Sequence, residues 1–70
     1  MEAFVLRVIE EKEQLDKKIE ALKAFRRSDV FSTLTYEEQY WLIMQLTTMQ
    51  QYQEILELRI MYYKRKENQS

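Results

Sequence analysis

The sequence contains neither glycine nor proline in its 70 residues. These two residues are the strongest breakers of helices and the commonest markers of tight turns. A chain without them has few ways to build the hairpin turns of a β-sheet, and long uninterrupted helices are favoured. The sequence therefore predicts an all-α protein in which two long helices are joined by a short turn or helical segment, forming a single domain over residues 1–70.

The first helix is predicted over about residues 2–27. Its apolar side chains recur at steps of three and four, which places them on one face of a helix. They are Val5, Val8, Leu15, Ile19 and Leu22, and the last position of the series falls on Phe25 or on the charged Arg26. Lys12 occupies one position in this series. The other faces carry acids and lysines, and pairs such as Glu13 and Lys17 are spaced to interact across one turn.

The connection is predicted over residues 28–35, which are rich in Ser, Asp and Thr. These residues compete with helical hydrogen bonding and favour caps and turns. We expect Ser28 or Asp29 to cap one short helical turn. Thr35 followed by Glu38 is typical of a capping box, which predicts that the second helix begins at Tyr36. That helix should run to about residue 66, before a polar and frayed tail over residues 67–70.

The second helix is apolar on more than one face. One stripe consists of Leu42, Leu46, Met49, Leu56, Ile60 and Tyr63, and a second set consists of Trp41, Met44, Ile55, Leu58, Met61 and Tyr62. One helical neighbour from the same chain cannot cover both sets. A chain of this length buries only about 60% of its unfolded surface, and without Cys it has no disulfides to compensate. The sequence therefore predicts a homo-oligomer.

Enzymatic chemistry is disfavoured because the chain has no His and no Cys. The usual bases, nucleophiles and soft metal ligands are thus missing, and a phosphate-binding loop cannot form without Gly. We expect no catalytic residues, no metal and no cofactor. The net charge of −1 gives no general attraction to DNA, to RNA or to anionic lipid. No stretch reaches the roughly 18 apolar residues of a membrane span, and no basic region precedes an apolar run at the start.

Cationic side chains are the remaining candidates for a binding site. Arg26 and Arg27 precede Ser28, and two guanidiniums beside a hydroxyl suit a phosphodiester. Cations at a helix C-terminus also interact favourably with the helix dipole, so a structural role stays open for them and for Lys64-Arg65-Lys66. Arg59 borders the apolar stripe, where it either binds a ligand or forms an ion pair with Glu54, Glu57 or a neighbouring subunit.

A longer pattern resembles a known family. It runs Glu11-(three residues)-Leu15, Lys18-Ile19, Leu22-(two)-Phe25-(two)-Ser28-(two)-Phe31-(two)-Leu34, and continues with Gln39, Gln45-(three)-Met49-(two)-Tyr52-(three)-Leu56-(two)-Arg59-Ile60. Between Val5 and Ile60 the chain is similar to the phage anti-CBASS sponge proteins, which bind and sequester the cyclic oligonucleotide signals of bacterial immunity.

The resemblance implies a homohexamer in the cytoplasm of the bacterial host. It also implies two kinds of pocket between protomers, one for cyclic dinucleotides and one for cyclic trinucleotides. By position, Arg26 or Arg27 would serve the dinucleotide, whereas Ser28 and Arg59 would serve the trinucleotide. A tyrosine that the family carries in its first helix has no counterpart here, because Glu11 or Lys12 stands near that place. Lys12 is therefore a candidate for contacting phosphate instead.

Two functions follow from this reading. The leading hypothesis is a protein that sequesters cyclic di- and trinucleotides without hydrolysing them. The alternative is a helical-hairpin module for protein–protein interaction that has no nucleotide ligand. Binding of a DNA or RNA polymer through the basic cluster at residues 64–66 is disfavoured by the slightly negative net charge.

Overall fold

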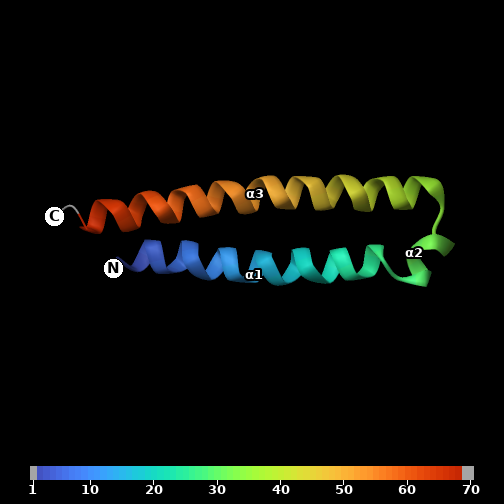
Figure 1. Ribbon diagram of the computed structural model, residues 1–70, viewed down its shortest axis with the longest axis horizontal. Coiled ribbons are helices and arrows are strands. Elements are labelled where there is room, and N and C mark those ends of the chain that lie inside the picture. Colours follow the sequence, from blue (N-terminus) through green and yellow to red (C-terminus); the bar gives the residue numbers. More distant parts are fainter. Residues whose placement is uncertain (1, 69–70) are drawn as a thin grey trace.

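The computed structural model describes residues 2–68 and contains three helices in this range, with no strand. These are α1 (Ala3–Arg26), α2 (Asp29–Thr33) and α3 (Tyr36–Asn68). The two long helices α1 and α3 lie side by side and run in opposite directions, and α2 connects them at one end (Figure 1). The protein is therefore all-α, with two long helices, as predicted.

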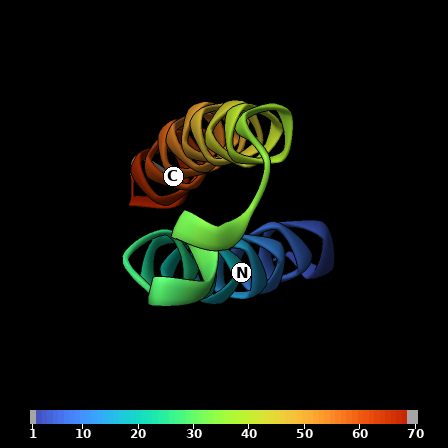
Figure 2. The same cartoon turned by 90° about the vertical axis from the view of Figure 1, so that its right-hand side faces the viewer.

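The hairpin is long and thin, with extents of 54 × 15 × 15 Å. Viewed from the end at which α2 lies, α1 and α3 form two layers with α2 bridging them (Figure 2). Each long helix therefore packs along its length against one other long helix, with α2 as a neighbour at one end only, and its other faces are exposed in the single chain. None of the helices within residues 2–68 combines the length and apolar character that crossing a membrane requires.

The core lies along the seam between α1 and α3. Its buried members are Val8, Leu15 and Ile19 of α1 with Leu46, Leu56 and Ile60 of α3, and Ile9, Leu22 and Met49 pack against them. Ile19 and Leu56 are almost completely buried, at 1% and 0% exposed. All of the core residues named here except Ile9 belong to the stripes that the periodicity placed on one face of each helix. Burying each such side chain contributes about 1.5–3 kcal/mol.

The connection is held by two caps. The hydroxyl of Ser28 accepts a hydrogen bond from the N–H of Phe31 at 3.4 Å and so caps α2. The hydroxyl of Thr35 accepts a hydrogen bond from the N–H of Glu38 at 3.1 Å. The Glu38 carboxylate accepts in return from the Thr35 hydroxyl at 2.9 Å and from its N–H at 3.5 Å. The predicted capping box is thus present where α3 begins.

The side chain of Gln39 fastens the start of α3 to α2. Its amide donates hydrogen bonds to the carbonyl oxygens of Phe31 and Leu34, at 3.1 and 3.2 Å. At its other end α3 continues through Glu67 and Asn68, where fraying had been expected. The last two residues of the predicted frayed tail, Gln69 and Ser70, lie outside the described residues.

Many large apolar side chains of α3 remain exposed. They are Tyr36, Tyr40, Trp41, Ile43, Met44, Tyr52, Ile55, Leu58, Met61 and Tyr62. The hairpin thus covers one apolar face of α3 and leaves others uncovered, as the sequence indicated. Homo-oligomer formation itself stays a prediction.

Candidate functional site

The candidate binding residues lie in two separate regions of the hairpin. Arg26, Arg27 and Ser28 are at the closed end, where α1 gives way to α2. Arg59 lies in the other half of the hairpin, at the level of Glu11 of α1. Roughly 17 residues of helix separate Glu11 from Ser28, a distance of about 25 Å along the axis. One chain therefore does not bring Ser28 and Arg59 together, and a site containing both needs two copies.

At the closed end the two arginines are exposed, whereas the hydroxyl of the serine already forms two hydrogen bonds within the chain. The guanidiniums of Arg26 and Arg27 both extend from the end of α1. The hydroxyl of Ser28 donates its proton to the carbonyl oxygen of Phe25 at 2.6 Å while it caps α2. A ligand that needs a donor from Ser28 must compete with this carbonyl. The two arginines are free of that restriction.

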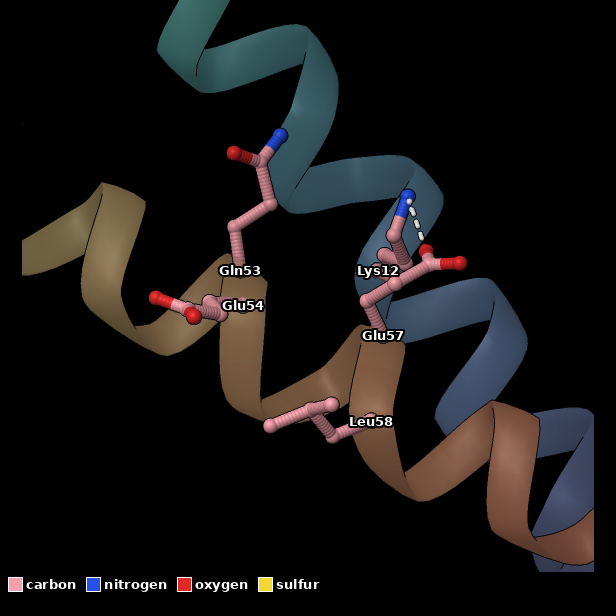
Figure 3. A pocket seen from close by; sticks show the side chains of 5 residues that line it. All are labelled: Lys12, Gln53, Glu54, Glu57 and Leu58. Atoms are coloured by element: carbon pink, nitrogen blue, oxygen red, sulfur yellow. Dashed lines mark ion pairs between the residues drawn. The ribbon is translucent and has the colours of Figure 1, made fainter.

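Lys12 belongs to a polar cluster between the two long helices (Figure 3). Its ammonium forms ion pairs with Asp16 of its own helix at 3.0 Å and with Glu57 of α3 at 3.2 Å. The amide of Gln53 donates a hydrogen bond to the other carboxylate oxygen of Asp16 at 2.7 Å. Polar groups within an otherwise apolar seam fix the register of two helices. The structure thus gives Lys12 a role in aligning α1 with α3.

The same contacts shift two pKa values. Hydrogen bonds to Asp16 and then to Glu57 raise the pKa of Lys12 above its usual value. Hydrogen bonds from Gln53 and then from Lys12 lower the pKa of Asp16 below its usual value. Both shifts favour the charged forms of Lys12 and Asp16, which stabilises the ion pair between them.

A shallow hollow of about 250 Å³ lies beside this cluster, lined by Lys12, Gln53, Glu54, Glu57 and Leu58. Pockets that enclose small-molecule ligands usually measure about 300–1,000 Å³. Two carboxylates on the wall also oppose a phosphate electrostatically. The hollow of a single chain is therefore too small and too acidic to hold a cyclic nucleotide by itself.

Arg59 is exposed and lies over an aromatic ring. Its guanidinium carbon is 5.9 Å from the centroid of Tyr63, within the range of a cation–π contact. Hydrogen bonding to Tyr63, with a smaller contribution from Glu11, raises the pKa of Arg59. Glu57, one of the partners considered for Arg59, pairs with Lys12 instead. The guanidinium is thus held in place by a ring and keeps donors for an anion.

Glu11 and Tyr52 form the third component of this region. The hydroxyl of Tyr52 donates a hydrogen bond to the carboxylate of Glu11, and this bond raises the pKa of Tyr52. Sequence reasoning named Glu11 and Tyr52 as separate members of the family pattern, with Glu11 near the place of a missing tyrosine, and it did not pair the two. Their contact joins α1 to α3 across the seam, so the spacing within one helix gives no signal for it.

Exposed aromatic side chains accompany the two arginines at the closed half of the hairpin. Tyr40 and Trp41 pack edge to face, with ring centroids 5.5 Å apart, and Tyr36 is 85% exposed. Aromatic faces of this kind are available for stacking. Within residues 2–68, no group of three or more His, Cys, Asp and Glu side chains is placed to hold a metal ion.

Comparison with known proteins relates the chain to a protein family and to a phage protein. The family model of Sequestin matches residues 2–62, which include α1, α2 and most of α3. An uncharacterized 7.5 kDa protein of the denB-rIIB intergenic region of Enterobacteria phage T4 is 44% identical over 64 residues, covering 91% of this chain and 100% of that protein. No solved structure matches. Both matches include the closed end of the hairpin and the two long helices that meet there.

Proposed function

The chain belongs to the Sequestin family, and we propose on this basis that it captures nucleotide signals by stoichiometric binding without turnover. The membership confirms the family relationship that the sequence pattern predicted. The ligands proposed are cyclic dinucleotides and cyclic trinucleotides of bacterial immune signalling, bound by a homohexamer in the cytoplasm of a bacterial host. The observation that carries this proposal is the family match over most of the chain.

The exposed arginines support a phosphate-bearing ligand. Arg26, Arg27 and Arg59 each present a guanidinium, which can donate two parallel hydrogen bonds to one phosphate. A cyclic oligonucleotide carries one phosphate for every base, so several cations must converge on it. Assembly of identical chains repeats each arginine by symmetry and supplies that convergence.

The proposed sites lie between copies, because one chain is insufficient for either ligand. Its hollow is small and acidic, and Ser28 is about 25 Å along the helix axis from the level of Arg59. In the trinucleotide site, Arg59 supplies the cations and Ser28 of another copy supplies the hydroxyl. In the dinucleotide site, Arg26 and Arg27 contact the phosphates. Lys12 contributes one N–H donor to a phosphate. Its ammonium has three such donors, and its two carboxylate partners occupy only two of them.

The test is a titration calorimetry panel of cyclic dinucleotides, cyclic trinucleotides, their linear counterparts and dinucleotides joined through a pyrophosphate. We expect saturable binding of cyclic ligands at a fixed ratio to protein. Denaturing the complex should then release the ligand unchanged, as chromatography can show. Release of a hydrolysed nucleotide would exclude sequestration. Binding of the pyrophosphate-linked compounds alone would keep sequestration but overturn the ligand class.

A second candidate function is supported by the exposed apolar surface of α3. A helical hairpin can dock on another protein through such a face without any nucleotide. Thermal unfolding separates the two candidates, because a ligand at a hundred times its dissociation constant stabilises the folded state by about 2.7 kcal/mol. No shift with any nucleotide of the panel would favour the interaction module.

A further inference from the structure

A regular stripe of seven residues runs along the side of α3 that faces away from α1. This outer stripe consists of Trp41, Met44, Thr48, Gln51, Ile55, Leu58 and Tyr62, which alternate at steps of three and four. All seven are exposed, and the five large apolar members are 46–64% exposed. Leu46, which faces α1, is two residues from Met44 and from Thr48, a rotation of about 200° around the helix. The outer stripe and the buried seam therefore occupy opposite faces.

We propose that the outer stripe packs against the outer stripe of a second copy, with the two α3 helices antiparallel and Thr48 facing Gln51 of the second copy. This inference deepens the self-association within the proposed function and names its surface, orientation and register. A heptad pattern of this kind is the sequence requirement for packing two helices along one seam. The buried stripe of α3 has the same spacing where it meets α1, so both faces of the helix have the spacing that helix packing requires.

The register follows from placing polar side chains opposite polar ones, and apolar side chains opposite apolar ones, along the two outer stripes. With Thr48 facing Gln51 of the second copy, Met44 faces Ile55 and Trp41 faces Leu58. Twofold symmetry repeats each of these pairs. The hydroxyl of Thr48 donates to the carbonyl oxygen of Met44 in its own helix, and at the centre it can accept a hydrogen bond from the Gln51 amide of the second copy.

A shift of one heptad destroys this match. Thr48 would then face Leu58, and Gln51 would face Ile55. The Thr48 hydroxyl donates to the carbonyl oxygen of Met44 in its own helix at 3.0 Å. The cost therefore falls on the Gln51 amide, which would be buried against Ile55 with its donors and acceptor unsatisfied. The polar centre therefore selects one antiparallel register.

The charges at the two ends of α3 select the antiparallel orientation. The first turn carries Glu37 and Glu38, whereas the last turn carries Arg65 and Lys66. A parallel pair in register also matches like with like along the outer stripe, but it places acids beside acids and bases beside bases. The antiparallel pair places the acidic turn near the basic turn and opposes the two helix dipoles.

The absence of native Cys allows a direct test by disulfide formation. Met44→Cys and Ile55→Cys change exposed residues that lie about 16 Å apart along the helix. A disulfide requires Cα atoms within about 7 Å of each other. In the proposed interface, a mixture of the two variants therefore gives a crosslinked heterodimer when it is oxidised with glutathione disulfide. Each variant alone gives little crosslinked product.

The control replaces Gln14, an exposed residue of α1, by Cys and mixes this variant with Ile55→Cys. We expect the mixture of Met44→Cys and Ile55→Cys to give at least fivefold more covalent dimer than the control mixture or either variant alone. Helix content by circular dichroism shows that each variant is folded. Efficient crosslinking of each variant alone would overturn the antiparallel orientation.

Light scattering distinguishes the failure of this interface from the failure of the proposed function. An assembled protein that gives no crosslink in the mixture would overturn the outer stripe as the interface, while self-association and nucleotide capture stand. A folded monomer that still binds the nucleotides in calorimetry would refute the interface alone. A folded monomer that binds none of them would refute both proposals.

Discussion

Two leucines of α3 that are two residues apart separate folding from assembly. Leu56 is 0% exposed and faces α1, whereas Leu58 is 58% exposed and belongs to the outer stripe. Replacing each by Asp makes the same chemical change on opposite faces of one helix. We expect Leu56→Asp to unfold the chain and Leu58→Asp to leave the hairpin folded but prevent assembly.

The magnitudes follow from burial. A chain of 70 residues has a total free energy of unfolding of about 4–10 kcal/mol. Leu56→Asp loses about 1.5–3 kcal/mol of apolar burial and adds about 3–5 kcal/mol for an unpaired buried charge, which together remove most or all of that stability. In the isolated hairpin, Leu58→Asp changes stability by only about 0.5 kcal/mol, as is usual for surface substitutions. In the proposed assembly, the carboxylate introduced at position 58 is desolvated once in every copy.

Circular dichroism melts and light scattering, carried out on both variants at the same concentration, give the comparison. Leu46→Asp should behave like Leu56→Asp, because Leu46 also belongs to the buried seam. The reasoning would be refuted by a Leu58→Asp variant that assembles like the parent. It would also be refuted by a Leu56→Asp variant that melts at the parent's temperature.

Three further predictions concern the ligand, the cap and the pH. Replacing Arg26 and Arg27 by Ala should weaken cyclic dinucleotide binding, and Arg59→Ala should weaken cyclic trinucleotide binding. In calorimetry, we expect each loss to be about 1.5–3 kcal/mol, or roughly ten- to hundredfold in affinity. Two variants that bind both ligands like the parent would contradict the assignment. Thr35→Ala removes the capping box and should cost about 1 kcal/mol in thermal unfolding, whereas Thr35→Ser should cost little. Because neighbouring amide and ammonium donors lower the pKa of Asp16, its contribution to stability is complete above about pH 4 and is lost as the pH falls through its folded pKa. For this partly exposed group we expect a loss of about 0.5 kcal/mol, and an Asp16→Asn variant whose acid destabilisation matched the parent's would contradict it.

Features that depend on one helix at a time could be predicted from the sequence. The apolar steps of three and four identified Ile19 and Leu56 as seam residues, and the Thr35–Glu38 spacing located the start of α3. Both signals are local, because a helix repeats its faces every few residues whatever lies beside it. Trp41 and Leu58 were likewise recognised as lying away from the seam.

Features that depend on how two helices align could not be predicted. Lys12 was recognised as a polar member of an apolar series, but its pairing with Glu57 needs the register of α1 against α3. The contact of Glu11 with Tyr52 needs the same information. The separation of Ser28 from Arg59, in contrast, follows from the predicted elements alone, because Ser28 lies beside the turn and Arg59 lies roughly six turns into α3.

The short connection through α2 has a consequence for the speed at which the protein becomes active. It places α1 beside α3 by closing one short loop, and early closure of short loops makes folding fast. The chain has no proline to isomerise and no cysteine to oxidise, so the two commonest slow steps of folding are missing. Assembly, in contrast, needs copies to meet, and its rate rises with concentration. For a function that requires the proposed assembly, the time from synthesis to activity is therefore governed by how quickly the chain accumulates.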